Sequence, residues 1–138
     1  MKKIGLFLLL TILCFANIKA QPVIAMGLSK SYIGRYLANY TQWALSSESN
    51  KTKLVYFNRE KQVTVTYIFL RDSPRRIAFT CVETIIQFPN ADSLQQYISD
   101  RLIACRFKPD KNGWIYLTDL YDLPIHVYQN NLKLTFKY

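Results

Sequence analysis

The amino-acid sequence predicts an α+β fold: a single small domain in which two helices pack on a mainly antiparallel β-sheet, formed by a meander and a C-terminal hairpin. Two segments carry apolar residues at helical spacing. Several others alternate apolar with polar residues, or are rich in β-branched and aromatic residues. Half of the residues are hydrophobic, enough for one packed core, and no repeat or linker divides the chain. We therefore expect one domain over residues 21–138.

The first helix is expected to begin after Ser29, which fits the N-cap position. Apolar residues then recur at intervals of three and four as far as Trp43 and Ala44. Gly34 weakens this helix by about 1 kcal/mol relative to alanine. The polar run at 46–50 is expected to end it.

Three strands are expected next, as an antiparallel meander over 53–58, 62–70 and 77–88. Turns at 59–61 and 71–76 separate them, and the second of these is rich in the turn-forming residues Pro, Asp and Ser. The end of the second strand, Tyr67–Leu70, is apolar at every position. That pattern predicts a strand covered on both faces.

The second helix is expected over Ser93–Ala104. Asp92 and Gln95 fit a capping box at its start. The apolar residues on its buried face are Leu94, Tyr97, Ile98, Leu102 and Cys105.

The rest of the chain is expected to be β-structure, with strands at 114–118, 125–129 and 132–138. The last two flank Asn130–Asn131, whose residue type tolerates positive φ in a tight turn. The final strand alternates apolar with polar residues. This alternation predicts one buried and one solvated face.

Residues 1–20 have the parts of a secretory signal peptide: Lys2 and Lys3, an uncharged and mostly apolar stretch over 4–16, and Ala20 before the expected cleavage site. A transmembrane anchor is the alternative. It needs about 20 apolar residues, and this run has about 13. We therefore expect export, to the periplasm or out of the cell, and no transmembrane segment after cleavage.

Removal of residues 1–20 leaves 15 of the 18 basic residues and all nine acidic ones, a net charge of +6. A positive balance suits an acidic protein, an anionic lipid surface or an anionic glycan. We expect no nucleic-acid partner for an exported chain.

Cys81 and Cys105 are the two cysteines left after cleavage. In an oxidising compartment we expect them to form a disulfide, which stabilises by about 3 kcal/mol. The alternative is two buried thiols. Both interpretations make the cysteines structural, because they lack the CxxC spacing of redox sites.

The sequence contains no recognisable catalytic constellation. His126 is the single histidine, and its candidate partners are Asp119, Asp122, Cys81 and Cys105. No nucleophile motif surrounds it, so we expect a solvated surface histidine and no enzymatic activity. We expect no metal and no cofactor, since neither a ligand cluster nor a Gly-rich phosphate loop occurs.

Two groups of residues are the predicted binding contacts. Arg71, Arg75 and Arg76 place three guanidinium groups on one turn, and such groups suit carboxylate, phosphate and sulfate. Tyr36 and Tyr40 lie along one edge of the first helix and offer an apolar body with a polar tip. The alternative roles are structural, as a solvated turn and as core packing.

The leading hypothesis is therefore a small, exported, non-enzymatic binding domain. Its expected partner is a protein or an anionic component of the cell envelope. The second hypothesis is a small-molecule binding protein with an aromatic-lined cavity between helix and sheet. The third is a weak hydrolase that uses His126.

Cleavage after Ala20 is directly testable. Mass spectrometry of the protein recovered from the cells that make it should show an N-terminus at Gln21, because Ala20 occupies the position just before the cut. The variant Ala20→Phe should retain residues 1–20. Wild-type chains that still begin at Met1 would contradict the prediction of export.

Overall fold

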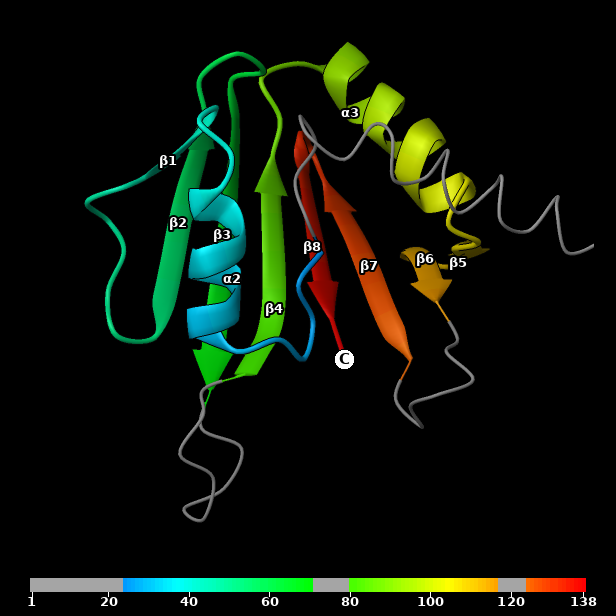
Figure 1. Ribbon diagram of the computed structural model, residues 1–138. Coiled ribbons are helices and arrows are strands. Elements are labelled where there is room, and N and C mark those ends of the chain that lie inside the picture. Colours follow the sequence, from blue (N-terminus) through cyan, green and yellow to red (C-terminus); the bar gives the residue numbers. More distant parts are fainter. Residues whose placement is uncertain (1–23, 71–79, 117–123) are drawn as a thin grey trace, which may run out of the picture.

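The structure is a computed structural model that describes residues 24–70, 80–116 and 124–138. Within these residues, eight strands form one antiparallel sheet, and the helices lie against it (Figure 1). The predicted combination of helices with a mainly antiparallel sheet is therefore correct in outline. The protein is richer in strands than expected, since β1 and β5 were not predicted as strands.

The strands form two meanders of four. The first comprises β1 (Trp43–Leu45), β2 (Lys53–Asn58), β3 (Val63–Leu70) and β4 (Thr80–Gln87), and the second β5 (Lys108–Asp110), β6 (Gly113–Tyr116), β7 (Ile125–Asn130) and β8 (Lys133–Lys137). The strand order in the sheet is β1-β2-β3-β4-β8-β7-β6-β5. The last strands of the two meanders, β4 and β8, therefore meet in the middle. Because a helix precedes each meander, the chain repeats one element order that no sequence repeat reveals.

Strict alternation along β3 separates the two faces of the sheet. Val63, Val65, Tyr67 and Phe69 are buried, whereas the residues between them are only partly buried. Successive side chains of a strand point to opposite faces, so one face of β3 belongs to the core. The expectation that the end of this strand is covered on both faces was wrong, since Leu70 is 57% exposed.

A β-bulge between β3 and β4 keeps the side chains on both sides of it in β4 directed towards the core. Ile68 pairs with Glu83 and the next residue of β3 pairs with Cys81, so Val82 is the extra residue. A bulge lets residues three apart share a face. Cys81 and Thr84 are accordingly both fully buried.

Both helices cover the same face of the sheet (Figure 1). Helix α2 (Lys30–Ala38) starts as predicted, with the Ser29 hydroxyl accepting a hydrogen bond from the backbone N–H of Tyr32. It ends at Asn39, earlier than expected. Trp43 belongs to β1 instead, because it pairs with the edge of β2 and is buried there.

Helix α3 (Ala91–Tyr97) continues directly into the π-helix η2 (Ile98–Ile103). Its N-cap is Asn90, whose side chain accepts from the N–H of Ser93 at 2.9 Å. Asp92 lies in the first turn instead of at the cap, which corrects the predicted capping box. Leu94, Tyr97, Ile98 and Leu102 are buried as predicted, whereas Cys105, also predicted on this face, lies after η2 and is only partly buried.

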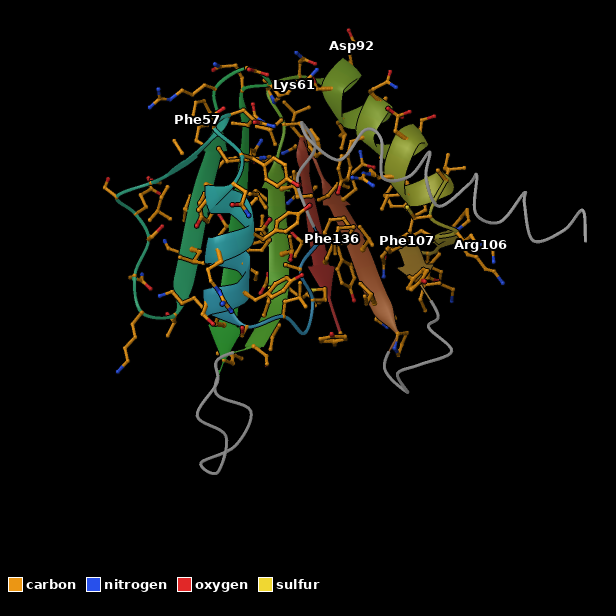
Figure 2. The ribbon with its side chains drawn as sticks, in the orientation of Figure 1. Phe57, Lys61, Asp92, Arg106, Phe107 and Phe136 are labelled. Atoms are coloured by element: carbon orange, nitrogen blue, oxygen red, sulfur yellow. The ribbon has the colours of Figure 1, made fainter. Side chains whose placement is uncertain are left out.

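Aromatic side chains join the second helix to the sheet. Phe107, just after η2, meets Phe136 of β8 edge to face, with ring centroids 6.2 Å apart. Figure 2 shows the two rings between β8 and the short strands β5 and β6. Phe136 is fully buried and Phe107 nearly so. This contact extends one core under both helices.

The predicted disulfide between Cys81 and Cys105 is absent. Cys81 is the second residue of β4; the Gly27 N–H donates to its carbonyl at 2.8 Å, and its thiol donates to the carbonyl of Glu83 at 3.3 Å. Cys105 follows η2 and leads into β5, which is the edge strand four places from β4 in the sheet. A disulfide needs Cα atoms within about 7 Å, and in this structure both cysteines are free thiols.

Truncation of the central core residue should test the assignment of the two faces. We expect Phe136→Ala to lower the free energy of unfolding by about 3–5 kcal/mol, because it leaves a cavity in a packed core. The neighbouring Thr135→Ala, on the opposite face, should cost less than about 1 kcal/mol. Urea unfolding followed by circular dichroism measures both. Equal losses would mean that the two faces are misassigned.

Candidate functional site

The face of the sheet away from the helices is covered by none of the helices in the described part of the chain. Its side chains alternate with those of the core, and all but one are partly or fully exposed; the exception is Val55 of β2, which is 4% exposed. We name this surface the open face. Its paired residues in the strands β2, β3, β4, β8 and β7 include Lys53, Val55, Phe57, Thr64, Thr66, Ile68, Glu83, Ile85, Gln87, Lys133, Thr135, Lys137, His126, Tyr128 and Asn130.

Strand register arranges these side chains in rows that cross the sheet. The middle row is uncharged: Thr66, Ile85, Thr135 and Tyr128 are direct neighbours from β3 to β7. The row on one side of it contains Ile68, Glu83, Lys137 and His126. The row on the other side contains Phe57, Thr64, Gln87, Lys133 and Asn130. Apolar and hydrogen-bonding groups are therefore mixed across several strands.

Glu83 is an acidic side chain within an otherwise uncharged strand. It points to the open face and pairs with Lys137, with 3.3 Å between the carboxylate oxygen and the ammonium nitrogen. The Glu83 side chain is 21% exposed and that of Lys137 is 49% exposed. The pair therefore presents mainly its cationic member to solvent.

Tyr128 is the large aromatic side chain that projects from this face, and it is 41% exposed. Its ring stacks near that of His126, with centroids 6.3 Å apart and planes 25° from parallel. Tyrosine is enriched among the residues that dominate binding energy at protein interfaces. Tyr128 lies opposite Thr135, within the middle row of uncharged groups.

His126 faces away from the core, as predicted from its alternation with Val127, which is buried. Cys81 is buried on the opposite face, so the sheet separates it from the imidazole. Burial also raises the pKa of the Cys81 thiol, which favours the unreactive protonated form. The other candidate partners Asp119 and Asp122 lie outside the described residues.

Tyr36 and Tyr40, predicted as contacts, form a pair at the edge of the core. Their ring centroids are 5.2 Å apart, and the Tyr40 hydroxyl donates to that of Tyr36 at 3.3 Å. Both are partly buried and pack against core residues. The exposed aromatic on the same helix is Tyr32, at 50%.

Burial raises the pKa of Tyr36 from its ordinary value of 10.0 to about 12, and the hydrogen bond with Tyr40 acts in the same direction. The guanidinium of Arg101, from η2, acts in the opposite direction. Tyr36 is therefore neutral at physiological pH, and it contributes packing and hydrogen bonding without charge.

The predicted arginine contacts Arg71, Arg75 and Arg76 lie outside the described residues. They belong to the segment that connects β3 to β4, two strands of the open face. Within the described residues, no cluster of three or more His, Cys, Asp or Glu side chains has the arrangement of a metal site. No helix in the same residues is long and apolar enough to cross a membrane.

Comparison with known proteins found no relative: no family model matches the sequence, and no curated protein or solved structure matches the chain. The candidate site therefore rests on the geometry of the sheet.

Sequence reasoning recognised parts of the open face without assembling them. The alternation in the last strand predicted that Lys133, Thr135 and Lys137 share a solvated face, and these residues are all partly or fully exposed. Their neighbours Glu83 and Tyr128 were not linked to them. The missing information was the order of strands, which places β8 between β4 and β7.

Alkaline titration should reveal the buried tyrosine pair. The unfolded chain loses the Tyr36 proton near pH 10.0, whereas the folded protein retains it up to about 12. The unfolded state then binds fewer protons in this window, so the free energy of unfolding should fall as pH rises from 10 to 12. Urea unfolding across this range measures the slope.

The variant Tyr36→Phe should have a shallower slope, because it removes one of the groups concerned. Tyr97 contributes in the same direction, since burial raises its pKa too, so part of the slope should remain. In Tyr40→Phe, the pKa of Tyr36 should move towards 10, as followed by NMR of ring-labelled tyrosine. An unchanged slope in Tyr36→Phe would contradict the buried pair.

Proposed function

We propose that the protein is an exported, non-enzymatic binding domain whose open face docks a partner protein. The observation that carries this proposal is the one-sided cover of the sheet. Both helices pack on one face, while Phe57, Ile68, Ile85 and Tyr128 on the other face are not buried. Large apolar side chains left partly exposed on one contiguous surface are a feature of interaction sites.

The dimensions of the open face favour a macromolecule over a small ligand. Neighbouring strands lie about 4.8 Å apart, so the five central strands span about 20 Å. Small molecules prefer concave sites that enclose most of their surface. A protein surface can instead contact several rows at once, with apolar residues in the middle and hydrogen-bonding groups around them.

Export is supported by the signal-peptide pattern of residues 1–20. The absence of an enzymatic role is supported by the separation of His126 from the Cys81 thiol, which lies on the other face of the sheet. Arg71, Arg75 and Arg76 remain proposed contacts, because they follow directly on a strand of the open face. Tyr36 and Tyr40, on the helix side, are proposed only as secondary contacts.

Site-specific photo-crosslinking in the cells that make the protein tests the docking surface. A benzophenone amino acid is placed in the full chain at Thr66 or at Tyr128, both on the open face. Matched controls place it at Ser31 or Gln95, exposed positions on α2 and α3. The open-face positions should yield the same protein adduct, identified by mass spectrometry, and the helix positions should not.

A second variant asks whether Tyr128 contributes binding energy. In the Thr66-labelled chain, Tyr128→Ala should lower the yield of that adduct, because an exposed tyrosine at an interface commonly contributes more than 1 kcal/mol. The melting temperature should change little, since the ring is 41% exposed. No protein adduct at either open-face position, or the same adduct from all four positions, would overturn the proposed function.

A further inference from the structure

The charges on the open face are unevenly distributed. Lys133 and Lys137 of β8 both point to it, and the acidic residue among the central strands is Glu83. Lys53 and Lys108 extend the same face towards its two edges, and Asp110 is the acid there. Lysines therefore outnumber acids on this face.

Two lysines remain available to a partner. Lys133 lies between Gln87 and Asn130, both uncharged, and it makes no ion pair with any described residue. Lys137 is paired with Glu83, yet its side chain is the more exposed of the two. An ammonium group has three donors, so Lys137 can hold Glu83 and still bind a second carboxylate.

Spacing along β8 gives these charges a defined geometry. Lys133 and Lys137 are four residues apart on one strand, a distance of about 13 Å between Cα atoms. Thr135 lies midway between them, with Ile85 and Tyr128 on its two sides. An uncharged strip therefore separates two cationic positions.

Resting on the proposed function, we propose that the open face recognises an acidic patch on its partner protein. The partner places an apolar or aromatic side chain against Ile85, Thr135 and Tyr128, and carboxylates on either side of it against Lys133 and Lys137. Complementary charges of this kind raise the association rate and define the orientation of docking. The fixed spacing of two lysines around one uncharged strip suits a protein surface, which can hold an apolar side chain between two carboxylates in a defined arrangement.

The first experiment identifies the part of the partner that contacts the open face beside β8. The adduct formed from benzophenone at Tyr128 is digested, and the crosslinked peptide of the partner is sequenced by mass spectrometry. A contact peptide rich in Asp and Glu supports the proposal. A protein adduct whose contact peptide lacks acidic residues overturns the acidic-patch proposal and leaves the binding domain standing. If no protein adduct forms, both the binding-domain proposal and the acidic-patch proposal are overturned. If the adduct is with phospholipid alone, the open face binds a membrane.

The second experiment uses poly-L-glutamate as a defined acidic probe. The protein, expressed as the full chain and then purified, is titrated at low salt while its backbone amide NMR signals are followed. We expect the largest shifts on β7 and β8, and loss of binding as salt is raised, because exposed ion pairs are screened. The variant Lys133→Glu should weaken binding about tenfold.

Lys51→Glu is the matched control, since it changes the net charge equally at an exposed residue between β1 and β2. It should retain most of the wild-type affinity. Equal losses in the two variants, or shifts centred on the helix side, would show that only the net charge matters and would overturn the proposal. Vesicles of phosphatidylglycerol provide the lipid comparison, and tighter binding to them than to poly-L-glutamate would also overturn it.

Discussion

The antiparallel pairing of β4 with β8 is the contact on which the rest of the structure depends. It joins the last strands of two meanders and turns eight strands into one sheet. On the helix side it places Thr84 beside Phe136 and Ile86 beside Leu134, all four with no exposed surface. Side chains alternate with a period of two, so a slip of one residue in this pairing would exchange the core face with the open face.

Only one face of the sheet is covered by the described helices, and this follows from the way the helices are connected. Each helix precedes its own meander, and both buried helical faces belong to the same core cluster. The opposite face keeps residues such as Thr66, Ile85 and Thr135, which suit a half-buried sheet surface without needing a second layer. An antiparallel sheet tolerates this arrangement, whereas parallel sheets are usually covered on both sides. The surface proposed for docking is therefore a consequence of the topology.

The individual strands of the candidate site were accessible from sequence, but their assembly was not. Alternation assigned Lys133 to a solvated face and His126 to the face opposite Val127, and the structure confirms both orientations. Neither pattern indicates which residue of the adjacent strand lies beside Lys133 or His126. The ion pair of Glu83 with Lys137 joins residues far apart in the chain, and only the pairing of strands brings them together.

Local chemistry by itself determined most of the elements: the capped start of α2, the apolar face of α3, the alternation in β3 and the turn at Asn131, where φ is +52°. These features depend on residues close in sequence, so spacing reveals them. Tertiary structure decided the rest. Trp43 continued the helical spacing yet forms a strand, because the edge of β2 offers it backbone partners. The two cysteines are free thiols: Cys81 lies on β4, whereas Cys105 follows η2 and leads into β5 at the far edge of the sheet. Which face stays open depends on where both helices pack, a long-range choice that no local pattern records.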